Sequence, residues 1–136
     1  MNLKPFLAST LAAGIVGNVI DTVVQGSVFT GMYYAKLPQL FRQDMNVPML
    51  IFGDFVAAAV LVWFYQMVRS SFGVGWMNGA RYGVCTGILT AFPLWIFMHM
   101  MFVGFPYALA WWLTIYSILW TAALGAITGL IHEKMN

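Results

Sequence analysis

The hydrophobic residues of this chain fall into four long, continuous runs that short polar segments separate. The runs cover about residues 5–30, 48–68, 79–103 and 106–131. As a helix, which rises 1.5 Å per residue, each run is long enough to cross a hydrocarbon core of about 30 Å. Continuous rather than alternating apolarity favours helices over a transmembrane β-barrel. We therefore predict an all-α integral membrane protein with a single domain, residues 1–136, of four transmembrane helices.

The segments between the runs predict an antiparallel, up-down bundle. Pro48 and Pro106 lie near helix starts, where the missing N–H group costs little. The turn at residues 104–106 is so short that the last two helices must form an antiparallel hairpin. Residues 31–47 form the longest connection, and their apolar side predicts an interfacial segment rather than a soluble domain.

Composition agrees with this pattern and excludes several other classes of protein. Hydrophobic residues make up 62% of the chain and charged residues only 7%, against about 25% charged residues in a typical soluble domain. This excludes a water-soluble globule, a disordered chain and an extracellular disulfide scaffold, and the single cysteine has no partner within the chain. A net charge of +2 is too small and too dispersed for a nucleic-acid-binding surface. The lipid bilayer is thus the first expected partner.

The distribution of basic residues predicts how the bundle is oriented. Four of them fall on the side of the two termini and two on the other side: Lys4, Arg69, Arg81 and Lys134 against Lys36 and Arg42. Because cytoplasmic loops carry an excess of Lys and Arg, we expect both termini in the cytoplasm of a multi-pass inner-membrane protein. The first run continues past the small residues at 12–13, so we expect a retained anchor rather than a cleaved signal peptide.

Small residues recur at helical spacing in three of the runs and predict where helices pack. In membranes such residues let two backbones approach closely, so that dispersion contacts accumulate. The predicted packing glycines are Gly14, Gly17, Gly79, Gly83, Gly87 and Gly125.

The strongest candidate for a functional site is a pair of acidic residues inside the apolar runs. Asp21 lies late in the first run and Asp54 early in the second, so helices of opposite direction bring both to the same layer, away from the termini. An ionisable side chain within a membrane is a functional candidate because burying it is costly. Asn18 and Gln25 share the helical stripe of Asp21 and complete a candidate proton- or cation-binding set.

The acidic pair also has structural interpretations that the sequence leaves open. Each carboxylate can simply hydrogen-bond to a neighbouring polar side chain, or Asp54 can pair with Lys36 or Arg42 folding back from the long connection. We expect Tyr107 and Trp111 of the fourth helix to join the layer of the two carboxylates. If the carboxylates face each other, they should share a proton and titrate as a coupled unit.

A second candidate is a copper site at the end of the third run. Its residues are Met98, His99, Met100 and Met101. Thioether and imidazole groups suit Cu(I), although adjacent residues on a straight helix point in different directions. We expect no other cofactor.

No motif specific to an enzyme or a named family occurs. The chain has no metalloprotease HExxH, no paired cysteines and no phosphate-binding glycine loop. In organisation it is similar to small bacterial inner-membrane proteins with four helices, and we expect no catalytic activity.

Three functions remain open at this stage. The first is a non-catalytic subunit or assembly partner of a membrane complex, packed as a homo-oligomer or against other membrane subunits. The second is a small proton- or cation-coupled transporter or channel that uses Asp21 and Asp54. The third is a copper-handling protein that uses His99 and the neighbouring methionines.

Overall fold

The computed structural model describes residues 2–135, and over that range the chain is helical with no strand. The long helices are α1 (Leu3–Val23), α3 (Val47–Phe72), α4 (Trp76–Met101) and α5 (Tyr107–Met135). Between α1 and α3 lie the π-helical segment η1 (Val24–Phe29), the short helix α2 (Thr30–Met32) and the 3-10 turn η2 (Tyr34–Lys36). Four helical spans are long and apolar enough to cross a membrane, which indicates a multi-pass membrane protein.

Each predicted run corresponds to one of the four spans, and the largest difference in length is in the first. Its helical path covers Leu3–Lys36, past the predicted end at residue 30. Thr30 and Gly31 are typical of a helix end, but the Thr30 hydroxyl donates to the Gln25 carbonyl (2.8 Å) and the helical path continues. The first span is therefore the longest, and Asp21 lies farther from its end than the sequence predicts.

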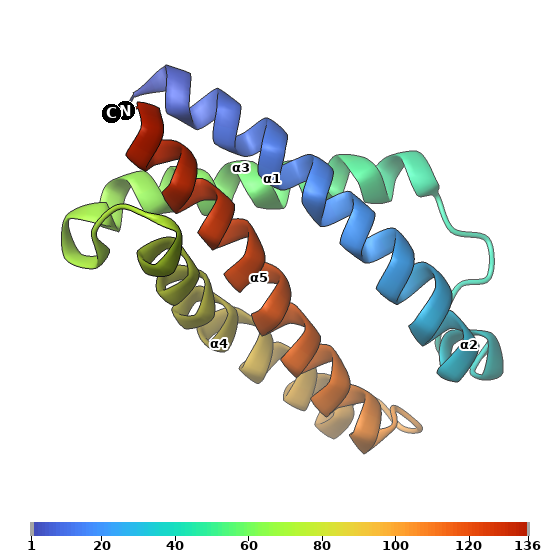
Figure 1. Ribbon diagram of the computed structural model, residues 1–136. Coiled ribbons are helices and arrows are strands. Elements are labelled where there is room, and N and C mark those ends of the chain that lie inside the picture. The colour runs from blue at the N-terminus through green and yellow to red at the C-terminus, as the bar shows by residue number, and fades with distance from the viewer. Residues whose placement is uncertain (1, 136) are drawn as a thin grey trace.

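Consecutive long helices run in opposite directions, and the start of α1 and the end of α5 lie at the same end of the molecule (Figure 1). The connections between α3 and α4 and between α4 and α5 are short turns. They need backbone conformations that favour glycine, with φ of 89° at Gly73, 100° at Gly75 and 86° at Gly104. The connection between η2 and α3 is longer and ends where the Asn46 side chain accepts a hydrogen bond from the Met49 amide (3.2 Å).

Helices α4 and α5 are in backbone contact along one stripe of glycines. A Cβ atom added to Gly79 would overlap the Gly125 carbonyl, and one added to Gly83 would overlap the Thr121 carbonyl. Gly87 faces the Thr121 side chain and the backbone of Ile118. Any larger residue on this stripe would force the two helices apart.

The two packing glycines of α1 contact aromatic side chains of other helices. A Cβ atom on Gly14 would overlap the Phe55 ring of α3, and one on Gly17 would lie 2.9 Å from the Trp120 ring of α5. The Trp120 indole N–H also donates to the Gly17 carbonyl (3.3 Å). Thus α1 is held between α3 and α5.

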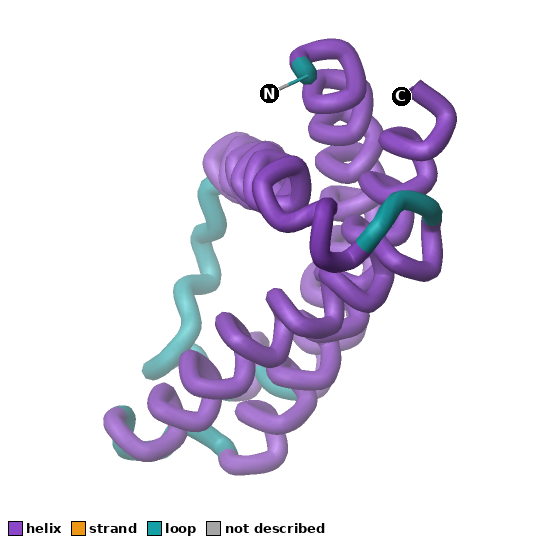
Figure 2. The backbone as a smooth tube through the Cα atoms, turned by 90° about the vertical axis from the view of Figure 1, so that its left-hand side faces the viewer, coloured by secondary structure: helices purple, strands orange, loops and turns teal. Residues whose placement is uncertain are grey.

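The core is divided into two clusters, and α3 takes part in only one of them. The cluster nearer the termini joins all four long helices through Ala13, Ala58, Leu61, Tyr65, Tyr82 and Leu124. The second cluster gathers Phe29, Phe105 and the start of α5 and contains no residue of α3. Correspondingly, the first half of α3 diverges from α4 and α5 (Figure 2).

Candidate functional site

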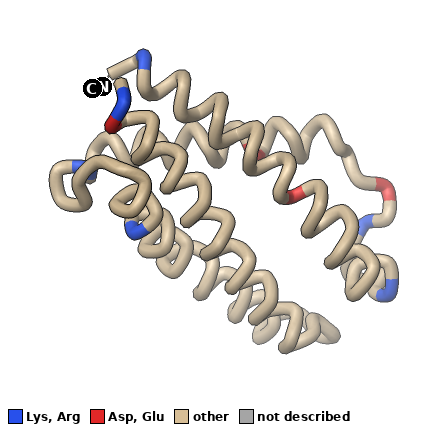
Figure 3. Tube along the Cα trace, viewed as in Figure 1, with Lys and Arg blue, Asp and Glu red and all other residues tan. Residues whose placement is uncertain are grey.

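Asp21 of α1 and Asp54 of α3 face each other between the two helices. Most charged residues lie at the two ends of the helices, whereas these two acidic positions lie along them (Figure 3). Both carboxyl groups line the same pocket between these helices. Like charges in a medium of low dielectric oppose each other's ionisation, so two neighbouring carboxyl groups can share one proton. The arrangement is therefore suited to a pair that holds one proton.

Two side chains donate hydrogen bonds to Asp21. The Tyr116 hydroxyl of α5 donates to Asp21 Oδ1, and the Gln25 amide donates to the same oxygen at 3.3 Å. Both donors bind the same oxygen, so the Asp21 carboxyl group links α1 to α5.

The π-helical segment η1 gives Gln25 its position. Gln25 lies near the start of η1, one turn after Asp21, and its side-chain oxygen accepts a hydrogen bond from the Tyr34 hydroxyl at 2.8 Å. A chain of hydrogen bonds therefore leads from Tyr34 through Gln25 to Asp21. Single π-helical turns inside α-helices are rare and recur at functional sites.

All four residues predicted as a proton- or cation-binding set line one pocket. The pocket has a volume of about 360 Å³, and Asn18, Asp21, Gln25 and Asp54 are in its wall. Thr22 and Tyr34 contribute two hydroxyl groups, and Met45, Val47, Leu50 and Ile51 contribute apolar surface. The site is therefore a small pocket whose wall combines carboxyl, amide and hydroxyl groups with apolar side chains.

Helix α5 contributes a different residue to the site from those that the sequence predicts. Tyr107 is exposed and packs against the rings of His99 and Trp111, while Tyr116 reaches Asp21. The prediction of Tyr107 and Trp111 was wrong because the first span continues beyond residue 30. If the first span ended at residue 30, Asp21 would lie beside the first turns of α5. Because the span is longer, Asp21 lies beside a part of α5 about two turns farther from the start of that helix.

No basic side chain neutralises the pair among the described residues. Within residues 2–135 the one ion pair joins Arg42 to Asp44 (3.8 Å), and both side chains are exposed. The alternative in which Lys36 or Arg42 folds back to pair with Asp54 is therefore not the arrangement found.

The residues of the predicted copper site are not brought together. His99 Nδ1 bonds to the Phe105 carbonyl (2.7 Å) and so closes the turn between α4 and α5. Met98 packs against the second core cluster, whereas Met100 and Met101 are exposed. Among the described residues there is also no group of three or more His, Cys, Asp or Glu side chains arranged to hold a metal ion.

A buried polar cluster near the termini is absent from the sequence-based candidates. His132 of α5 is fully buried, and its Nδ1 donates to the Thr128 carbonyl (2.8 Å), with Ser9 Oγ of α1 at 3.3 Å. Its Nε2 accepts from the Gln66 amide of α3 (3.0 Å), which also donates to the Asn2 carbonyl (3.0 Å). The cluster links three helices. Sequence spacing could not predict this cluster, because its members come from three separate spans.

We expect His132→Leu to lower the free energy of unfolding by about 1–3 kcal/mol. Leucine fills similar space but removes the imidazole partner of the fully buried Ser9 hydroxyl, and an unmade buried hydrogen bond has a cost of this size. Thermal denaturation in detergent measures the change. Glu133→Gln, at the exposed neighbouring position, is the control and should leave stability unchanged. Equal stability of all three proteins would show that the cluster contributes nothing.

Comparison of the chain with protein-family models, with curated proteins and with solved structures gives no match.

Proposed function

We propose that this protein is a small membrane carrier that exchanges a proton for a monovalent cation at Asp21 and Asp54. The observation that carries the proposal is the meeting of two carboxyl groups in one pocket, with no basic side chain neutralising them among residues 2–135. Like charges in a medium of low dielectric oppose each other's ionisation, so the pair retains a proton. A bound cation supplies the missing positive charge, which allows that proton to leave.

A purely structural role is a weaker explanation of the same geometry. A carboxyl group that only holds helices together needs a donor, and Asp54 faces another acid instead. Asparagine or serine in its place would provide a hydrogen bond without the cost of an ionisable group. In the proposed exchange no covalent bond is made or broken in a substrate, so the protein is not an enzyme.

Purified protein in liposomes tests this function. Liposomes loaded with potassium or tetramethylammonium chloride are diluted into cation-free buffer, and a trapped pH dye reports the lumen. We expect the lumen to acidify, because each cation that leaves is exchanged for a proton that enters. Acidification no faster than in protein-free liposomes would contradict the proposal.

We further propose that the protein lies in a bacterial inner membrane with both termini in the cytoplasm. Four basic residues on the side of the termini against two on the other support this orientation. In a variant whose exposed Cys85 is replaced by serine, a cysteine at Gln39 should react with an impermeant thiol reagent on intact cells. A cysteine at Ser71 should react only after permeabilisation, and the reverse pattern would overturn the orientation.

An assembly role is the second candidate function, and the divergence of α3 favours it. The first half of α3 lies outside both core clusters and exposes Met49, Leu50, Ile51 and Phe52. Because four helices enclose little volume, a second copy or another membrane subunit packed against this half would complete the bundle. Native mass spectrometry of the detergent-purified protein tests this: an oligomer or a co-purifying subunit supports it, and a bare monomer contradicts it.

A further inference from the structure

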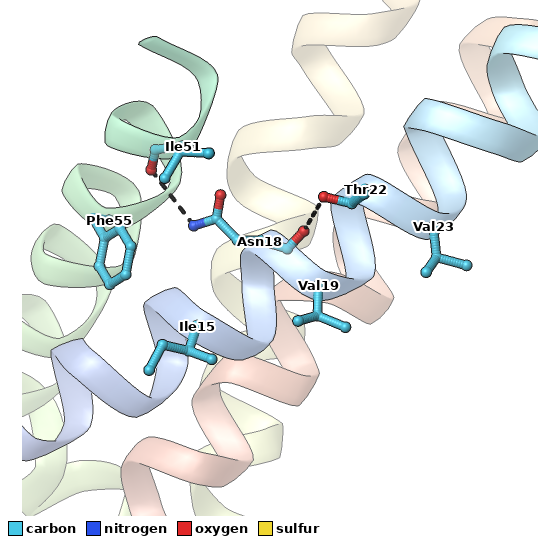
Figure 4. A pocket seen from close by; sticks show the side chains of 7 residues that line it. All are labelled: Ile15, Asn18, Val19, Thr22, Val23, Ile51 and Phe55. Carbon is cyan, nitrogen blue, oxygen red and sulfur yellow. Dashed lines mark hydrogen bonds between the residues drawn. The ribbon is translucent and has the colours of Figure 1, made fainter. Parts of the chain in front are cut away.

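A second, mainly apolar pocket adjoins the acidic pocket. It has a volume of about 370 Å³, and its apolar lining comes from Ile15, Val19 and Val23 of α1 and from Ile51 and Phe55 of α3 (Figure 4). Its two polar lining residues, Asn18 and Thr22, line the acidic pocket as well, and so does Ile51. The two pockets therefore share a wall but differ in chemistry.

The apolar pocket lies on the surface of the bundle that faces lipid. Ile15, Val19 and Val23 are 50%, 59% and 57% exposed, and they follow one another along the outer side of α1. In a span of this length and hydropathy, such side chains contact acyl chains. A molecule dissolved in the bilayer can therefore reach this pocket without passing through water.

Asn18 is one of the three residues that line both pockets. Asn18 extends from α1 toward α3 (Figure 4), and its amide nitrogen donates to the Gly14 carbonyl (2.9 Å) and, over 3.5 Å, to the Ile51 carbonyl. The Thr22 hydroxyl is turned back onto the Asn18 carbonyl of its own helix (2.8 Å). Only the long bond from Asn18 to the Ile51 carbonyl crosses from one helix to the other at this boundary.

We propose that the exchanged cation is an amphipathic organic ammonium ion that enters from the bilayer. Its alkyl part occupies the apolar pocket, and its ammonium group lies against Asp21 and Asp54, where its charge complements the carboxylates. This inference rests on the proposed proton–cation exchange. One proton leaves the carboxyl pair as one ammonium ion binds, so the charge of the site is the same with either occupant.

Size and solvation both favour this class of ligand over a small metal ion. Each pocket is at the lower end of the range of about 300–1,000 Å³ that is usual for small-molecule sites. A compact ion would have to shed its water in a site whose wall is partly apolar, which is costly. An alkylammonium ion places its apolar part against the apolar wall and its charge at the acidic pair.

A series of alkyltrimethylammonium ions tests the inference in lipid nanodiscs that contain the whole chain. Tetramethyl-, butyltrimethyl- and hexyltrimethylammonium chloride are titrated into the nanodiscs in weak buffer, and the release of protons is recorded. The signal from nanodiscs without protein is subtracted. We expect the apparent affinity to rise severalfold for each methylene group that enters the apolar pocket. Potassium chloride serves as the metal-ion comparison and should release the proton only at much higher concentration.

Variants that fill the apolar pocket separate its contribution from that of the carboxyl pair. Val19→Trp, at a position that lines only the apolar pocket, should abolish the gain with chain length while tetramethylammonium still releases the proton. Leu119→Trp, at a lipid-facing position of α5 that is 63% exposed and lines neither pocket, should behave like the wild type. Ile15→Trp, which also lines the apolar pocket alone, repeats the test if Val19→Trp fails to fold.

The outcomes distinguish this inference from the function on which it rests. Proton release with equal affinity across the series, or a gain with chain length that survives in the folded tryptophan variant, overturns the amphipathic ligand but leaves proton–cation exchange intact. No proton release with any of the ammonium ions or with potassium overturns the exchange itself, and the amphipathic ligand with it.

Discussion

Replacing Asp54 with asparagine is expected to reduce cation-driven proton movement to the level of protein-free liposomes. The amide has nearly the same shape as the acid, so the helices should still pack, but it has no proton to release. Asp21→Asn should have the same effect, because the remaining acid then has no second carboxyl group with which to share a proton. Each variant removes half of the exchanging unit, and neither half is expected to work alone.

The matched control for these variants is Asp44→Asn. It removes the same charge from an exposed position in the connection, where Asp44 pairs with Arg42 outside the pocket. Its transport should equal that of the wild type. Wild-type rates in Asp54→Asn would mean that the acid is structural and would leave the assembly role as the remaining proposal.

Replacing Gly83 with leucine is expected to separate α4 from α5 and to unfold the bundle. The added side chain would meet the Thr121 carbonyl and the Ala122 backbone, which cannot rotate away as a flexible side chain can. Overpacking a core usually costs about 1–3 kcal/mol. The loss here should exceed that range because the contact is with backbone. Thermal denaturation and gel filtration in detergent measure it.

Gly53→Leu is the control for that change. It adds the same side chain to a glycine of α3 where a Cβ atom meets nothing within 4 Å. The control should denature at close to the wild-type temperature. Equal stability of the two leucine variants would remove the case for a backbone-to-backbone contact between α4 and α5.

The four helices and the meeting of the two acids could be predicted from the sequence. They depend on the lengths of the apolar runs and on the position of each acid within its run. Continuous apolar runs predict all four spans, with the largest error at the end of the first. The alternation of helix direction then brings a late residue of the first span and an early residue of the second to one layer. Asp21 and Asp54 do lie together, with Asn18 and Gln25 in the same pocket.

The hydrogen-bond partners at the site could not be predicted in the same way. The position of Gln25 depends on the π-helical turn, and no local residue pattern predicts where an extra residue enters a helix. Tyr116, rather than Tyr107, reaches Asp21 because the first span is longer than its apolar run. Likewise, His132 meets Ser9 and Gln66 only through the packing of three helices.

Infrared difference spectroscopy of the carboxyl groups tests the central claim most directly. The account predicts that wild-type protein at neutral pH shows the carbonyl band of a protonated carboxylic acid and that tetramethylammonium removes it. The Asp54→Asn variant should lack that band, since Asp21 then keeps only the donors Tyr116 and Gln25. A wild type without a protonated acid, or with a band that the cation leaves unchanged, would contradict a proton shared between Asp21 and Asp54 and exchanged for a cation.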